Sequence, residues 1–253
     1  MIFGNDRTKG FTLIELMCSM VIASIILLLI AITLAASGDS YGRIKANVES
    51  EREGRTLVNQ LVSDLANAQF HKHFMIQKSP NVWPTDHLGF LTLAPALAQS
   101  ETGRVGDLCA VVYYIKDLTI NGKTVRCVMR GFRESLETFK ALENNDVSLI
   151  YQENLALDEP IALGIISFAA RPKLRDTNGK WIDWAESTHT NPQAIDLRIV
   201  VARHTLARRL NTADDWNGVG AAGSLIGNAT HAERNANLEV YSTMICLKSH
   251  EID

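Results

Sequence analysis

One carboxylate stands alone in the most apolar part of the chain. The 26 residues from Phe11 to Ala36 contain a single charged side chain, that of Glu15. A charge at the centre of a membrane-spanning helix costs on the order of 3 kcal/mol, so a carboxylate near the start of such a segment needs a partner and tends to mark function. Glu15 is therefore the first candidate functional residue.

The residues ahead of this block carry a second signal. A polar leader with two basic residues, 1–10, ends at Gly10, which is followed by Phe11 and, four residues further on, by Glu15. This run resembles the class III signal of type IV pilins and pseudopilins. The resemblance implies that a prepilin peptidase cuts between Gly10 and Phe11, methylates the new terminal phenylalanine and leaves the apolar segment on the mature protein.

Cleavage at that bond would create a partner for the carboxylate. A free α-amine on Phe11 has a pKa of about 8 and is cationic at neutral pH, so it can pair with Glu15 of a neighbouring subunit. Such a pair would set the axial register between subunits. The alternative is that Glu15 merely reaches the membrane surface in a simple signal anchor. The leader, glycine, phenylalanine and glutamate at this spacing together favour the pilin-type signal.

The apolar block is long enough to cross a membrane. As a helix, Phe11 to Ala36 would span about 39 Å, against a hydrocarbon core of roughly 30 Å. A cleaved secretory signal has a shorter apolar region, roughly 7 to 15 residues. The lysines and arginines on the two sides of the block do not orient the chain by themselves. A single-pass inner-membrane location with a periplasmic C-terminal domain is therefore what the resemblance implies.

The helix is expected to continue beyond the membrane. No proline occurs between Phe11 and Ser79, and apolar residues recur at helical spacing to about Phe74. The sequence thus predicts a spine helix with a transmembrane half, 11–36, and an amphipathic continuation, 37–76. Its glycines just outside the span indicate either close helix packing or, as we favour, a flexible joint.

The remainder, 77–253, is expected to be a β-rich globular domain, which makes the fold class α+β. The clearest feature is a hairpin over 107–132 with its turn at Asn121-Gly122. A short helix is predicted over 134–142. Further strands are predicted at 147–151, 165–170, 194–202 and 238–247. A stretch rich in glycine, alanine and asparagine, near 211–237, is expected to be a flexible insertion.

Several segments of the body carry a second resemblance. They are similar to the J-type minor pseudopilins of type II secretion. The similar features are a strand at 166–171, a glycine turn at 176–181 with tryptophans at Trp181 and Trp184, and a following strand at 194–201. Two other segments, 107–114 and 134–142, are similar to the large pilin-like proteins called Verru_Chthon cassette protein C. These resemblances imply a pilin-like domain on the spine helix.

Other candidate chemistry is weak. His71-Lys72-His73 places two histidines on different faces of a helix, without a ligand at metal-binding spacing, so surface residues are favoured. Asp176-Thr177-Asn178-Gly179 lacks the closing glutamate of a calcium loop and is better explained as a turn. Trp181 and Trp184 could line a ligand groove but are more often core or interface anchors. We therefore expect no catalytic residue, cofactor or metal.

The cysteines beyond the membrane block allow one disulfide. The hairpin turn would place Cys109 opposite a residue near Glu134 and not opposite Cys127, so that pair fails on geometry. Buried thiols are expected at Cys109, Cys127 and Cys246, and Cys18 should pack as a small apolar residue in the membrane block.

A formal net charge of -3 does not point to nucleic acid. The resemblances imply a minor pseudopilin, a non-catalytic structural subunit at or near the tip of a type II secretion-like pseudopilus. Its implied partners are other pilin or pseudopilin subunits, the prepilin peptidase and methyltransferase, and an inner-membrane assembly platform with its ATPase. Two alternatives remain: a minor pilin of a type IV pilus, for adhesion, motility or DNA uptake, and a membrane-anchored periplasmic enzyme.

Overall fold

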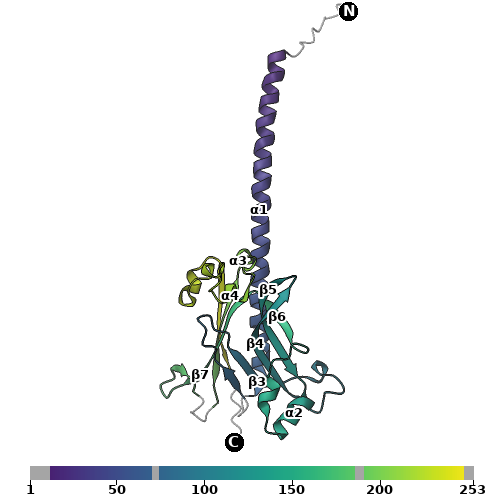
Figure 1. Cartoon of the computed structure of the whole chain (residues 1–253), viewed down its shortest axis with the longest axis vertical. Helices are drawn as coiled ribbons and strands as arrows, with labels where there is room; N and C mark the ends of the chain where they lie inside the picture. The colour runs from purple at the N-terminus through teal and green to yellow at the C-terminus, as the bar shows by residue number, and fades with distance from the viewer. Residues whose placement is uncertain (1–11, 70–73, 186–190, 248–253) are drawn as a thin grey trace, which may run out of the picture. The chain divides into compact units, whose positions relative to one another are not determined.

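The structure is a computed structural model that describes residues 12–69, 74–185 and 191–247. The chain divides into two compact units, Met1–Lys45 and Ala46–Asp253. Helix α1 spans Leu13–Ala66 and so contributes to both units (Figure 1). A long N-terminal apolar helix followed by a β-rich region confirms the predicted α+β class.

Helix α1 ends earlier than the sequence predicts. It was expected to reach about Phe74, but it stops at Ala66, and strand β1 (Ala68–Gln69) begins almost at once. The backbone carbonyl of Asn67 accepts a hydrogen bond from the amide of Leu93 at 3.0 Å. Pairing with a neighbouring strand therefore takes over the backbone groups that a longer helix would have used.

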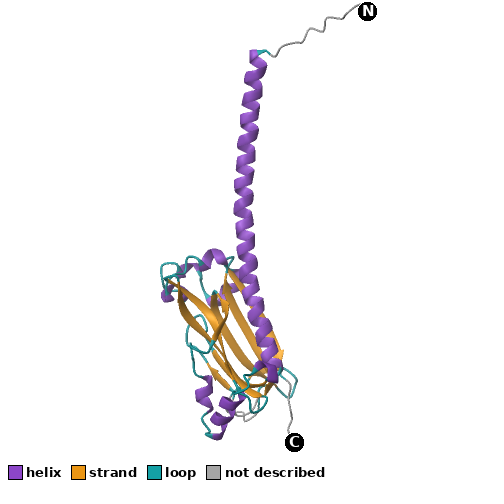
Figure 2. Ribbon diagram, turned by 90° about the vertical axis from the view of Figure 1, so that its right-hand side faces the viewer, coloured by secondary structure: helices purple, strands orange, loops and turns teal. Residues whose placement is uncertain are grey.

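The strands of the second unit form two antiparallel sheets (Figure 2). Sheet A has the order β1-β3-β4-β5-β6, with β2 also paired to β3. Its further strands are β2 (Met75–Gln77), β3 (His87–Leu93), β4 (Leu108–Ile120), β5 (Lys123–Arg133) and β6 (Glu159–Leu163). Sheet B has the order β10-β9-β7-β8 and consists of β7 (Ile165–Arg175), β8 (Trp181–Asp183), β9 (Ala194–Ala202) and β10 (Leu238–Cys246).

Short helices complete the unit. They are α2 (Ser135–Glu143), α3 (His204–Ala207), α4 (Ala213–Trp216), η1 (Ala96–Ala98), η2 (Val147–Tyr151), η4 (Gly223–Leu225) and η5 (Ala229–Arg234). Helix α2 confirms the helix predicted over 134–142. Strands β9 and β10 confirm those predicted at 194–202 and 238–247, and β7 extends the predicted strand at 165–170 to Arg175.

The predicted hairpin is present as β4 and β5. Ile120 lies opposite Lys123, and the turn residues Asn121 and Gly122 have φ angles of 51° and 77°. Two consecutive residues with positive φ are what a two-residue hairpin turn needs, and asparagine followed by glycine tolerates them best. The local sequence therefore fixes both the turn and the register of the longest strand pair.

The main core lies where the last turns of α1 meet both sheets. Leu57, Leu61 and Leu65, one turn apart, are fully or almost fully buried, at 0 to 1% exposure. They join Phe90 of sheet A and Phe168 of sheet B in one apolar cluster. This i, i+4 spacing is the amphipathic stripe from which the second half of the helix was predicted.

The predicted strand at 147–151 is wrong. The segment forms the 3-10 helix η2 instead, and its Ile150 and Tyr151 are buried on the other face of sheet A. The ring of Tyr151 occupies the space where Gly89 of β3 would carry a Cβ atom. These residues favour strands, but here their side chains pack onto the face of sheet A and their backbone does not join a sheet.

The segment near 211–237 is not the open, flexible loop that the sequence suggested. It contains α4, η4 and η5 and buries Trp216, Ile226 and Ala232 on the outer face of sheet B. The indole Nε1 of Trp216 donates a hydrogen bond to the backbone carbonyl of Thr124 at 2.9 Å. Residues 204–234, here called the sheet B cover, therefore form a packed layer over part of that sheet.

Candidate functional site

The candidate processing and assembly site lies at the start of α1. Gly10 and Phe11 fall outside the described residues, and Thr12 is the first residue that the structure describes. The amide and the hydroxyl of Thr12 both donate to Oε2 of Glu15, each at 2.9 Å. The Thr12 hydroxyl also accepts from the Glu15 amide at 3.4 Å, and the Thr12 carbonyl accepts from Leu16 at 3.2 Å.

These reciprocal bonds are a capping box, in which a threonine and a glutamate three residues later satisfy amides at a helix start. The motif explains why α1 begins at Leu13. Sequence reasoning had assigned Glu15 no partner within its own chain and had overlooked Thr12. The spacing Thr-x-x-Glu, visible in the sequence, is the signal that would have found it.

The capping box leaves part of the carboxylate free. Both bonds from Thr12 reach Oε2, and no described residue donates to Oε1 of Glu15. The side chain is exposed, like every other from Thr12 to Gly38. Glu15 can therefore stabilise its own helix start and still accept a donor from another molecule.

The helix that carries this site is suited to a membrane. Residues Leu13–Gly38 have a mean hydropathy of 2.8 and are not buried within the chain, and by length and composition they could cross a bilayer. The hydroxyls of Ser19, Ser24 and Thr33 donate to backbone carbonyls of the preceding turn at 2.8 to 3.0 Å. These polar groups are thus satisfied without water.

In the second unit, an ionic cluster ties the end of α1 to sheet A. Asp64 of the helix accepts from the guanidinium of Arg130 at 2.7 Å and from the hydroxyl of Tyr113. The backbone carbonyl of Asp64 also accepts from Thr92 at 3.1 Å. Burial, together with the charge of Asp64, raises the pKa of Tyr113 well above its usual value. Tyr113 therefore stays protonated and serves as a donor.

A second buried pair closes the other side of sheet A. Asp158 accepts from Arg133 at 2.6 Å, from the hydroxyl of Tyr114 at 2.7 Å and from the amide of Asn154 at 2.8 Å. Burial alone would raise the pKa of Asp158, but the bonds from Arg133, Asn154 and Tyr114 outweigh it and hold that pKa below its usual value. Both clusters are structural ties between elements.

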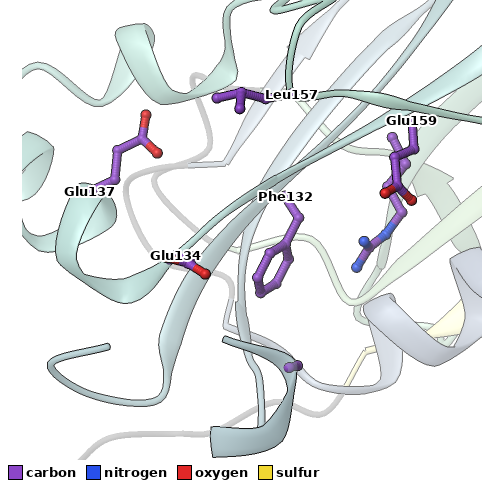
Figure 3. Close-up of a pocket in the computed structure, with 7 residues that line it drawn as sticks. Phe132, Glu134, Glu137, Leu157 and Glu159 are labelled. Atoms are coloured by element: carbon purple, nitrogen blue, oxygen red, sulfur yellow. The ribbon is translucent and has the colours of Figure 1, made fainter. Parts of the chain in front are cut away.

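The body also has an open cavity of about 480 Å³ (Figure 3). The Phe132 ring lies between Glu134 and Glu137 on one side and Glu159 on the other. The Glu134 carboxylate accepts from the amide and the hydroxyl of Ser100, and these bonds lower its pKa. No serine, histidine or cysteine is among the residues lining the cavity.

Of the other residues singled out in the sequence, some lie in the part of the chain that the structure describes and some do not. His71-Lys72-His73 lies outside the described residues. The turn prediction at 176–179 is confirmed, because the Gly179 amide donates to the Asp176 carbonyl at 2.9 Å. The Trp181 ring lies 4.6 Å from the guanidinium carbon of Arg175, and Trp184 packs edge-on against Phe74. Within residues 12–69, 74–185 and 191–247, no group of three potential metal ligands occurs.

The cysteines are free thiols. Ala110 lies opposite Arg133, so the register places Cys109 beside Glu134 and excludes a bond to Cys127, as predicted. Burial raises the pKa of Cys109 and of Cys127 to about 11, so both stay protonated. The prediction of a buried thiol is wrong for Cys246, which is exposed on β10.

Comparison with known protein families finds one matching motif, at the start of the chain. Residues 5–31 match the prokaryotic N-terminal methylation motif. No curated protein matches the chain. The matched segment contains Gly10, Phe11 and Glu15, and it indicates a type IV pilin-like or pseudopilin protein. It implies processing by a prepilin peptidase and assembly with other pilin subunits.

Proposed function

We propose that the protein is a minor pseudopilin, a structural subunit at or near the tip of a type II secretion-like pseudopilus, and that it catalyses no reaction. The observation that carries the proposal is the Glu15 carboxylate, exposed at the start of an apolar helix within the methylation motif, with one oxygen free of bonds from described residues. The glycine turn and tryptophan pair that resemble J-type minor pseudopilins favour this role over that of a minor pilin in a type IV pilus.

In this proposal the subunit assembles in two steps, a charge pair at the start of α1 and apolar packing along the rest of its membrane segment. Removal of residues 1–10 frees the α-amine of Phe11, and the amine pairs with Glu15 of a neighbouring subunit. Until that partner arrives, the bonds from Thr12 hold the carboxylate in place. The apolar side chains of Leu13–Gly38, which none of the described residues bury, then pack against neighbouring spine helices.

The other partners follow from the same proposal. Before assembly the subunit is held in the inner membrane by its single span, with the C-terminal domain in the periplasm. An assembly platform and its ATPase extract it into the filament. The β-rich body contacts neighbouring subunits.

Mass spectrometry of the mature N-terminus tests the proposal. The chain is purified from cells that contain a prepilin peptidase, and in parallel as the Gly10→Val variant, which should block the cut. We expect the native chain to begin at N-methyl-phenylalanine 11 and the variant to keep residues 1–10. A native chain that keeps its leader, or one cut elsewhere, would overturn the proposal.

A further inference from the structure

The open cavity beside Phe132 is partly apolar (Figure 3). Ala98, Phe132 and Leu157 supply its apolar lining. Leu157 is itself 60% exposed, and Leu97, the neighbour of Ala98 in the chain, is 99% exposed. Exposed apolar side chains gathered around a hollow are typical of a surface that another protein covers.

The same cavity carries negative charge. Glu134 and Glu137 lie on one side of the Phe132 ring and Glu159 lies on the other (Figure 3). Among the lysines and arginines that the structure describes, none forms an ion pair with these three carboxylates. Glu134 accepts bonds from Ser100, whose amide and hydroxyl are neutral. The carboxylates around the ring are therefore left without a cationic partner in the described chain.

Arg130 also lines the cavity, but it is bonded to another acid. It lies opposite Glu159 in the pairing of β5 with β6. Its guanidinium nevertheless donates to both carboxylate oxygens of Asp64 in α1, at 2.7 and 3.1 Å. The guanidinium carbon lies 5.3 Å from the centroid of the Phe132 ring. Asp64 thus balances the charge of Arg130, and Glu159 keeps its charge for a partner from outside.

Charge and apolar surface together define the side chain that fits. A long basic side chain has an apolar stem and a charged end, so its stem can lie on Phe132 and Leu157 while its end reaches the carboxylates. Arginine fits better than lysine, because its planar guanidinium has five donors and can bond carboxylates on both sides of the ring. A small free cation would leave Leu97 and Leu157 uncovered. The basic group is therefore expected on the surface of a protein.

We propose that this cavity docks an arginine side chain, flanked by apolar residues, from a neighbouring subunit of the filament. Its guanidinium bonds Glu137 and Glu159, and its apolar neighbours cover Leu97 and Leu157. The inference rests on the proposed function, which supplies the neighbouring subunits. It names the surface through which the β-rich body contacts them.

Site-specific photo-crosslinking of the full-length chain, in cells with the native assembly machine, tests the proposal. The photoreactive residue p-benzoyl-phenylalanine replaces Leu157 in one variant and Ala98 in another, and mass spectrometry maps the adducts. We expect both positions to crosslink to another pilin-like subunit, at a segment that contains an arginine. The same photoreactive residue at Val219, which is 81% exposed in the sheet B cover, is the control and should not give that adduct.

Charge variants show whether the carboxylates hold the partner. Glu137→Lys and Glu159→Lys change exposed side chains and should each lower the yield of the adduct by about tenfold or more. If lysine disturbs the fold, Glu137→Gln and Glu159→Gln remove the charge without adding one. Glu143→Lys is the matched control, because Glu143 is exposed on the same helix α2 but does not line the cavity. It should leave the yield unchanged.

The mature N-terminus of the same protein is measured in parallel, so that the two proposals fail separately. If the chain begins at Phe11 but gives no adduct, the docking proposal alone is overturned. An adduct at a segment without an arginine, or a yield that the glutamate variants do not change, has the same consequence. A chain that keeps residues 1–10 overturns both proposals.

Discussion

The two units of the chain differ in whether their apolar side chains are buried and their charged side chains are paired. In the first unit, the apolar residues from Leu13 to Gly38 are exposed, and Glu15 has only Thr12 as a described partner. In the second, apolar residues form closed clusters, and buried charges such as Asp158 and Arg133 are paired. The apolar side chains of the first unit therefore need lipid or a neighbouring subunit to cover them, whereas the core side chains of the second are covered by its own helices and strands. We expect changes in the core of the second to affect stability and changes in the first to affect assembly.

The largest effect on stability is expected at the buried ion pair. The side chains of Arg133 and Asp158 are 3% and 0% exposed. Asp158→Ala leaves the guanidinium buried without its partner, which should lower the free energy of unfolding by about 3–5 kcal/mol. Urea unfolding of the full chain measures this. The matched control is Glu153→Ala, which breaks the partly exposed pair with Lys116 and should cost about 1 kcal/mol or less.

The same pair sets a pH dependence. Because the pKa of Asp158 is lower in the folded chain than in the unfolded one, its contribution is present above a pH of about 4 and is lost as the pH falls through the folded pKa. The difference between the native chain and Asp158→Ala should therefore shrink on acidification. A difference that is equal at neutral and acidic pH would show that the negative charge of Asp158 is not the source of its stabilising effect.

A smaller effect on stability is expected from replacing a glycine of α1, and it should differ between Gly54 and Gly38. An added Cβ at Gly54 would collide with the ring of Tyr241, whereas at Gly38 no described atom lies within 4 Å. Gly54→Ala should destabilise the body by about 1–3 kcal/mol, because an overpacked site forces its neighbours to move. Gly38→Ala should leave the body unchanged. Equal unfolding free energies for the two variants would contradict the contrast between the units.

The difference between the units also explains what could be predicted from the sequence. The membrane helix and Glu15 were predictable, because composition and a short motif define them without tertiary contacts. The β4–β5 hairpin was predictable for the same reason, since Asn121-Gly122 determines its turn locally.

The elements that were missed depend on contacts distant in sequence. Strand β3 contains Gly89, and a larger residue at this position would collide with the ring of Tyr151. The sheet B cover looked like a loop because glycine, alanine and asparagine dominate it. It is ordered by a few buried side chains such as Trp216, which contact strands far away in the sequence. Local patterns contain no record of such partners.

In the proposed filament, the Glu15 carboxylate forms an ion pair with the α-amine of Phe11 in a neighbouring subunit. Its most direct measurement is the amount of protein incorporated into purified filaments from cells with the native assembly machine, comparing Glu15→Gln with Glu15→Asp at equal membrane levels. Glutamine keeps the size and an acceptor oxygen but removes the charge, so we expect incorporation to be lost, while aspartate should retain part of it. Incorporation of Glu15→Gln at the native level would contradict the account.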